Sequence, residues 1–193
     1  SLPHPGFSYL QRVRGEAPRG LRIAYSADLG YAVVQSDVAA AVEDAVGVFR
    51  SLGHTVQRIE GGPPEAGRAW GLLGAFLLAS QLDSHLAGRE ELIGRGLMAG
   101  IELARREMNA HHFGELAALR AAIVRWCASL FDRYDLLLTP TVPFDPYAAP
   151  GPYPQATEGR PQPWSNVGSF TIPFNLSWHP AATVRVGLSR RGL

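Results

Sequence analysis

The fold class is decided by residues 21–60, LRIAYSADLGYAVVQSDVAAAVEDAVGVFRSLGHTVQRIE. The segment begins with LRIAYS (21–26), whose alternating apolar residues are typical of a short strand. Ser36 is a plausible N-cap, and apolar residues then recur at helical spacing through 38–52. A second strand is predicted at 55–60. Since a helical crossover of this length joins parallel strands, the unit indicates an α/β fold.

Downstream of this unit, residues 64–133 are predicted to be helical. Residues 66–84 are apolar on nearly every side, and at this length we expect a buried core helix rather than a membrane span. Further helices are expected at 90–109 and 114–133. In the last of these, apolar residues recur at alternating intervals of three and four positions and form a seam along one face of the helix. They are Leu116, Leu119, Ile123, Trp126 and Leu130. Cys127 lies beside this seam, where a free cysteine is usually a buried small hydrophobe; a catalytic thiol is the alternative.

The last part of the chain, 134–193, is predicted to hold a strand, a Pro-rich loop, a helix and a strand. DLLLT at 135–139 is an apolar run stopped by proline, which indicates a buried central strand. Residues 140–165 contain 8 of the 15 prolines, a density that excludes helix interiors and central strands. We expect partial helix at 166–177 and, from its alternation, a strand at 183–188 with Val184, Val186 and Leu188 facing inward.

Composition and length place the chain among globular proteins. It has 193 residues, 46% of them hydrophobic, and a formal net charge of +1, which suits one domain and gives no electrostatic reason to bind nucleic acid or an anionic membrane. The chain has one cysteine and no apolar leader, so we expect a soluble cytoplasmic protein. We divide the domain into a lead-in (1–20), a strand–helix–strand unit (21–60), a helical part (64–133) and a C-terminal part (134–193).

All 18 basic residues are arginine, and the chain has no lysine. This excludes a Schiff-base lysine, a phosphate-binding P-loop lysine and a lysine general base within these residues. Methionine occurs only at Met98 and Met108. Because Ser1 is not a natural translation start, we expect the chain to be processed or cut from a larger protein.

One group of residues has a metal-like spacing. Glu107, His111 and Glu115 step by four along one predicted helical face, with His112 beside them. Zinc sites prefer more histidine or cysteine, and no HExxH motif is present. We therefore favour a solvated polar face or a helix–helix junction and predict no metal, while a metal or His/Cys centre stays the alternative.

The end of the 135–139 strand is the best position for a ligand. It places Thr139 and Thr141 at a carboxyl edge, outside which open α/β sheets bind ligands. The Pro-rich segment starts there, so we expect it to cover a cleft. Trp164 and Trp178 lie in or beside irregular chain, where they line a pocket or anchor the loops to the core.

The same residues carry a resemblance to a known family. YDLLLTPTVP (134–143) followed by FTIPFNLSWHPAATV (170–184) resembles the C-terminal half of the amidase signature family. LRIAYS, Asp28-Leu-Gly and Leu52-Gly-His also resemble that family. The resemblance implies a partial amidase-signature fold, a mixed sheet flanked by helices, and hydrolysis of amide C–N bonds without a cofactor.

The family uses a Ser–cis-Ser–Lys triad in a Gly/Ser-rich setting, and this chain departs from that pattern. It has no lysine and no two adjacent serines among its 12. We therefore expect the fragment to lack the N-terminal catalytic part, to contain no catalytic residue and to be inactive alone.

Further departures concern the substrate. Trp178 stands where the family usually has glycine, and Arg185 where it often has proline; Arg95 is a loose match to a family arginine. In the A subunit of glutamyl-tRNA(Gln) amidotransferase, an aspartate binds the glutamine amino group. Aligned on Thr171, that position is Gly168 here, so the charge-assisted partner of an ammonium is absent.

From the resemblance we expect Thr141, Asn175, Trp178 and His179 to lie near the substrate channel of the full enzyme. For Asn175 and His179, the alternative role is only to satisfy buried backbone groups. The expected partner is a small-molecule amide, with no nucleic acid and no membrane, and a homodimer is the assembly considered. The alternatives are a stand-alone, non-catalytic α/β binding module and a part of the A subunit of the tRNA-linked amidotransferase.

Overall fold

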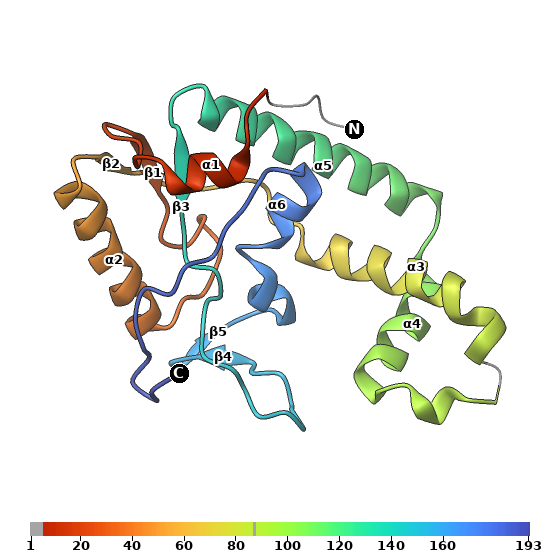
Figure 1. Cartoon of the computed structure of the whole chain (residues 1–193). Coiled ribbons are helices and arrows are strands. Elements are labelled where there is room, and N and C mark those ends of the chain that lie inside the picture. The colour runs from red at the N-terminus through yellow and green to blue at the C-terminus, as the bar shows by residue number, and fades with distance from the viewer. Residues whose placement is uncertain (1–5, 87) are drawn as a thin grey trace.

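The computed structural model describes residues 6–86 and 88–193 (Figure 1). Part of the predicted 1–20 lead-in therefore lies outside the described residues. The helices and strands, in chain order, are α1 (Tyr9–Arg14), β1 (Arg22–Tyr25), α2 (Ser36–Ser51), β2 (Thr55–Arg58), α3 (Gly67–Leu86), the 3₁₀ turn η1 (Glu90–Leu92), α4 (Arg95–Glu107), α5 (Ala110–Phe131), β3 (Leu136–Leu138), β4 (Ala156–Thr157), β5 (Arg160–Pro161), the 3₁₀ turn η2 (Trp164–Gly168) and α6 (Ile172–Ser177).

The predicted strand–helix–strand unit forms a parallel pair, which confirms the α/β class. β1 is the middle strand of the order β2-β1-β3 and is parallel to both neighbours. Arg22 aligns with Thr55, and Ile23 aligns with Leu136. The antiparallel pair β4–β5 stands apart as a two-stranded ribbon.

Alternation along β1 explains why helices cover both faces of the sheet. Ile23 and Tyr25 pack with Val42 and Val46 of α2, whereas Ala24 packs on the other face with the C-terminal end of α5. Successive side chains of a strand point to opposite faces, so three consecutive buried residues require a cover on each side. Figure 1 shows α2 and α5 on either side of the strands.

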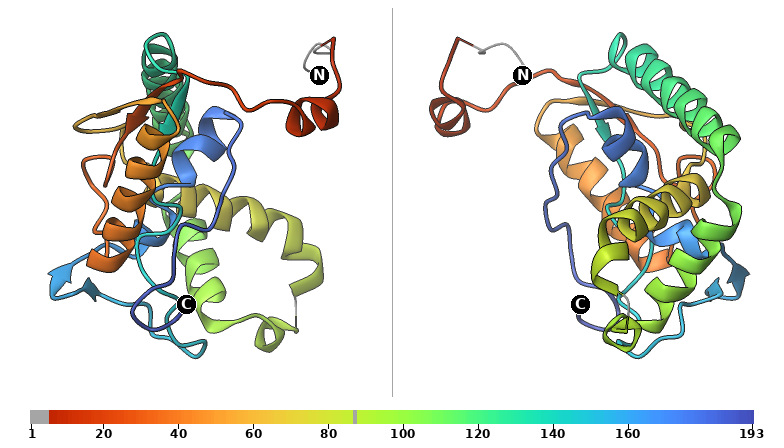
Figure 2. Two further views of the ribbon diagram at one scale, coloured as in Figure 1. Left: turned by 60° about the vertical axis from the view of Figure 1, so that its left-hand side comes forward. Right: turned by 90° about the vertical axis from the view of Figure 1, so that its right-hand side faces the viewer.

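The helical part extends away from the sheet. Both views of Figure 2 show α3 and α4 side by side and α1 standing apart from the rest of the chain. α5 continues the core through Ile123 and Cys127, which pack against Ile172 and Leu176 of α6. Within residues 6–86 and 88–193, no helix combines the length and apolar character needed to span a membrane.

The strand predicted at 183–188 is wrong, because this segment is irregular. Val184, Val186 and Leu188 are 71%, 43% and 64% exposed. Alternating apolar residues form a strand only where a neighbouring strand pairs with the backbone through hydrogen bonds. No described strand pairs with this segment. The segment is tied to α2 instead, since the Arg190 N–H donates to Asp37 Oδ2 at 2.8 Å.

The prediction of a buried central strand at 135–139 is also wrong in its position. β3 is an edge of the described sheet, and Leu136 is 44% exposed. Leu137 packs towards α5 and Leu138 towards α2, so the apolar run correctly indicates two covered faces. It carries no information on how many strands lie beside it.

Several helix boundaries differ from the prediction. The expected helix at 90–109 is divided into η1 and α4. α5 begins earlier than expected, because Asn109 is its N-cap and its side chain accepts from the His111 N–H at 2.9 Å. Ser36 is the first residue of α2 rather than its cap; its hydroxyl and its N–H both donate to the Glu158 carboxylate.

Candidate functional site

The loops that follow β1 and β2 meet at the carboxyl edge of the sheet. A Cβ atom added to Gly62 would lie 2.5 Å from the Leu29 carbonyl oxygen, and one on Gly30 would lie 2.9 Å from the Gly61 Cα. The Leu29 N–H donates to Ser26 Oγ at 3.0 Å. These contacts permit almost no side-chain volume between the loops, so the edge is a closely packed platform.

A buried amide fixes the end of the Pro-rich segment to this platform. Asn166, 1% exposed, accepts from the Val33 N–H at 3.0 Å and donates to the Val33 carbonyl at 2.9 Å. It also donates to Gln162 Oε1 at 2.7 Å, and Thr157 Oγ1 donates to the same oxygen at 2.7 Å. Sequence reasoning missed this network, although an asparagine and a glutamine among prolines were the visible signal.

Thr141 follows β3, as expected, and is exposed. Its Oγ1 lies 3.3 Å from Oγ1 of Thr183, with either hydroxyl able to donate. This contact joins the start of the Pro-rich segment to the chain downstream of His179. Thr139 instead donates its hydroxyl to the Pro140 carbonyl at 2.8 Å.

The other three predicted residues lie together at the end of α6. Asn175 is exposed on the helix. Trp178 ends the helix in the left-handed region with φ 61° and is 78% exposed. The Arg120 guanidinium lies 3.9 Å from the centroid of the Trp178 ring, and its Nε–H donates to the Leu176 carbonyl at 2.8 Å. Trp178 therefore presents a large aromatic face on a fixed support.

His179 belongs to a short chain of polar contacts that reaches into the core. Its Nδ1 lies 3.0 Å from Ser177 Oγ, and its ring stacks on Phe131 with 5.2 Å between centroids. Ser177 Oγ also lies 3.7 Å from Cys127 Sγ. Cys127 is fully buried, and burial raises the pKa of its thiol, against a smaller lowering by the Ser177 hydroxyl. The thiol is thus a core group, as the sequence indicated.

The metal-like spacing does not form one helical face, because the helix is interrupted between its members. Glu107 ends α4 and pairs with Arg68 of α3 at 3.0 Å. His111 Nε2 lies 3.3 Å from Glu115 Oε1 on an exposed part of α5, which matches the solvated polar face. In the described part of the chain, no three His, Cys, Asp or Glu side chains are grouped to hold a metal ion.

A cavity of about 220 Å³ lies between α3 and α4. Its lining residues are Arg68, Gly71, Leu72, Ala75, Gly96, Gly100, Leu103 and Trp164. Only Trp164 among them comes from the Pro-rich segment, so one of the two tryptophans does line a pocket.

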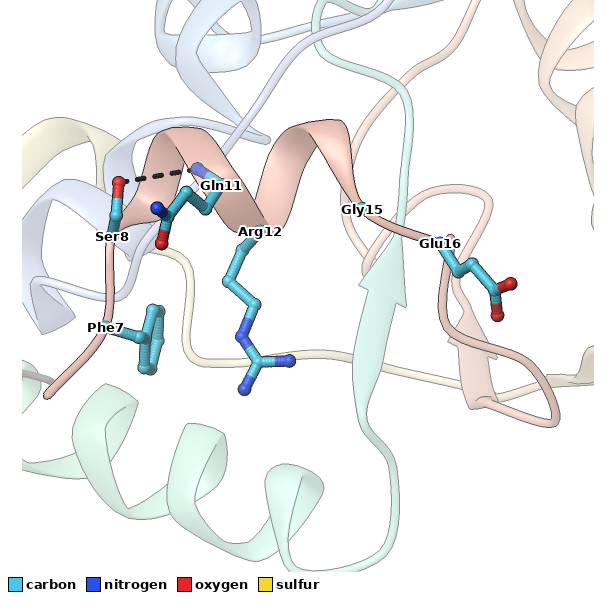
Figure 3. Close-up of a pocket in the computed structure, with 6 residues that line it drawn as sticks. All are labelled: Phe7, Ser8, Gln11, Arg12, Gly15 and Glu16. Carbon is cyan, nitrogen blue, oxygen red and sulfur yellow. Dashed lines mark hydrogen bonds between the residues drawn. The ribbon is translucent and has the colours of Figure 1, made fainter.

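A second cavity, of about 290 Å³, lies along α1 (Figure 3). Arg12 lies over the Phe7 ring, 5.0 Å from its centroid, and the Gln11 N–H donates to Ser8 Oγ. α1 has six residues and buries none of them. This cavity is therefore a hollow along an exposed helix, and we assign it no function.

Comparisons with known proteins identify relatives along the whole chain. The family model Amidase matches residues 3–193. An acylamidase of Rhodococcus erythropolis is 28% identical over 200 residues, which cover 100% of this chain and 40% of that protein. The A subunit of glutamyl-tRNA(Gln) amidotransferase from Zymomonas mobilis is 32% identical over 107 residues, which cover 55% of this chain and 21% of that protein. The chain thus spans less than half the length of either relative.

Solved structures agree with the sequence comparison. A bacterial aryl acylamidase of the amidase signature family superposes with a TM-score of 0.77 at 25% identity, covering 89% of this chain and 38% of that one. The 6-aminohexanoate cyclic dimer hydrolase shares the fold, with a TM-score of 0.71 at 24% identity, covering 98% of this chain and 43% of that one. The family match across nearly every residue, together with this fold, shows that the chain belongs to the amidase signature family.

Proposed function

We propose that this chain is the part of an amide-hydrolysing enzyme that supports the active site and lines its substrate channel. The observation that carries the proposal is the family match over residues 3–193. Similarity to an acylamidase along the whole chain supports hydrolysis of an amide C–N bond. The aryl acylamidase structure, with a TM-score of 0.77, supports an aryl amide as the first substrate to test.

The chain by itself is proposed to be inactive. Amide hydrolysis through an acyl-enzyme needs an activated nucleophile and a group that takes its proton. The family pattern supplies these with two serines and a lysine, and this sequence contains no lysine and no adjacent serines. The nucleophile and its base would therefore come from residues outside this sequence.

The chain's contribution would be the wall of the channel. Trp178 offers an exposed ring held against Arg120, and Thr141 offers a hydroxyl at the end of β3. Asn175 is exposed on α6, three residues before Trp178, and the His179 ring is held by Phe131 and Ser177. We propose that these four side chains contact the substrate.

A free-standing amidase is favoured over a component of the tRNA-linked amidotransferase. Gly168 is buried at the position where the pattern of the amidotransferase carries its ammonium-binding aspartate. A Cβ atom there would lie 2.5 Å from Ile172 Cδ1. A carboxylate at this point would have to displace Ile172 and lose water, so the local packing supports a substrate without an ammonium group.

The proposal is tested by labelling the chain with a fluorophosphonate, which forms a covalent bond with an activated serine oxygen as fluoride leaves. Intact-mass spectrometry is expected to show an unmodified chain. Ser177 is the serine to watch, since its Oγ lies 3.0 Å from a histidine nitrogen. A stoichiometric adduct at Ser177, lost in Ser177→Ala, would contradict the proposal and favour a nucleophile within this chain.

A further inference from the structure

Glycine and alanine make up half of the lining of the cavity between α3 and α4. Gly71 belongs to α3, and Gly96 and Gly100 belong to α4. A Cβ atom on Gly96 would meet nothing within 4 Å, and one on Gly100 would meet only the Ala75 methyl at 3.8 Å. Bare backbone at Gly96 and Gly100 therefore leaves a flat surface of α4 facing the space between the helices.

Trp164 closes one side of the cavity. A Cβ atom on Gly71 would lie 2.2 Å from the Trp164 ring, so the indole rests against bare helix backbone and any larger residue would expel it. The ring is 54% exposed. The indole therefore keeps an open aromatic surface beside the cavity, which is available for stacking on another ring.

The end of the cavity at the start of α3 is polar. Arg68 lines it, and its Nη2 donates to Glu107 Oε2 at 3.0 Å, which ties the start of α3 to the end of α4. Arg68 is 73% exposed. A guanidinium carries five N–H donors, so this pairing leaves donors for a carbonyl or nitro oxygen at the mouth.

We infer that the cavity binds the aromatic ring of an aryl amide, with the ring between Trp164 and the α4 glycines and an oxygen acceptor facing Arg68. A volume of about 220 Å³ exceeds the roughly 150 Å³ that holds benzene in an engineered apolar cavity, and it is below the roughly 300 Å³ of whole-ligand sites. One substituted ring therefore fills it. The inference rests on the proposed amide hydrolysis only for the choice of ligand.

The test measures binding rather than turnover. The purified protein is titrated with 4-nitroacetanilide by ligand-observed NMR, with acetamide as the matched amide that has no ring. Gly96→Leu fills the cavity at a helical position with free space, so it is expected to fold normally. We expect it to weaken binding of 4-nitroacetanilide at least about tenfold, which equals about 1.4 kcal/mol.

Gly74→Leu is the control, because Gly74 is an exposed α3 residue outside the cavity lining, also with nothing within 4 Å of an added Cβ. It is expected to leave the affinity unchanged. Trp164→Ala removes the aromatic wall and provides a second variant, expected to weaken binding without filling the space. Circular dichroism and urea unfolding establish that each variant is folded.

Equal affinity of the wild type and the folded Gly96→Leu variant would overturn the inference, as would equal affinity for 4-nitroacetanilide and acetamide. Neither result affects the proposed function, which the fluorophosphonate experiment decides. Conversely, an adduct at Ser177 would overturn the proposed function and leave the measured affinities of this cavity standing.

Discussion

Arg120 of α5 holds Trp178 at the end of α6: its guanidinium lies 3.9 Å from the indole centroid, while its Nε–H donates to the Leu176 carbonyl. One side chain thus supports the aromatic face and satisfies a carbonyl that the helix end leaves without a partner. Trp178 adopts φ 61°, a conformation that favours glycine. The contact with Arg120 offsets part of that cost, which makes Arg120 the support of the proposed substrate wall.

Arg120→Ala is expected to lower the free energy of unfolding by about 1–2 kcal/mol, because it removes one cation–π contact and one hydrogen bond. Urea unfolding measures the change. Arg125→Ala, an exposed arginine on the same helix, is the control and should change stability by less than about 0.5 kcal/mol. Equal effects of the two substitutions would contradict the proposed support by Arg120.

Asn166→Ala is expected to cost about 2–4 kcal/mol, since it leaves the N–H and C=O of Val33 without their partner and removes one of the two donors to Gln162 Oε1. The variant should also loosen the Pro-rich segment, which limited proteolysis would detect as earlier cleavage. Val167→Ala, at a neighbouring residue that is 39% exposed, serves as the control. A loss no larger than that of the control would show that the network contributes little.

Gly168→Asp tests whether the missing carboxylate can be restored. We expect destabilisation of about 2 kcal/mol or more, because Ile172 must move and a carboxylate enters a buried position. No gain in glutamine binding is expected by calorimetry. Gly74→Asp places the same charge on an exposed helical position and controls for the helix cost. A stable variant that binds glutamine would contradict the proposed preference for a substrate without an ammonium group.

The C-terminal segment is expected to detach in acid. The Asp37 carboxylate accepts from the Arg190 N–H, which is the largest cause of its lowered pKa, and also from Gln35 and Val38. A carboxyl whose pKa is lower in the folded chain than its unfolded value of about 3.9 stabilises the fold at pH values above the unfolded pKa. This stabilisation is lost as the pH falls through the folded pKa.

Hydrogen exchange of the Arg190 amide measures this detachment. Its protection should persist at neutral pH and disappear in acid, below about pH 4. Asp37→Asn should give weak protection at both pH values, since a neutral amide oxygen accepts less strongly than a carboxylate. A pH-independent protection of Arg190 in the wild type would rule out control by Asp37.

The fold was predictable where a periodic pattern and a stop signal coincide. Residues 21–60 give alternation, helical spacing and then alternation, and β1, α2 and β2 form there in parallel. The apolar seam of α5 likewise predicts the burial of Ile123, Cys127 and Leu130. The spacing of apolar residues shows which face of a helix or strand is buried, and this information lies in the local sequence.

Pairing and long-range polar contacts were not predictable in the same way. Val184 and Val186 alternate like a strand yet are exposed, because no described strand pairs with them. The Asn166–Val33 hydrogen bonds join residues 133 positions apart. The α3–α4 cavity depends on Trp164 meeting Gly71. Each of these depends on the tertiary arrangement, which local spacing does not specify.

The most direct test of the proposed inactivity is the rate at which the purified 193-residue chain hydrolyses 4-nitroacetanilide, followed by release of 4-nitroaniline. We expect no release above the uncatalysed background, because the chain contains no lysine and no adjacent serines. Catalysed release that disappears in His179→Ala would contradict the proposal, since the reacting groups would then lie within this chain.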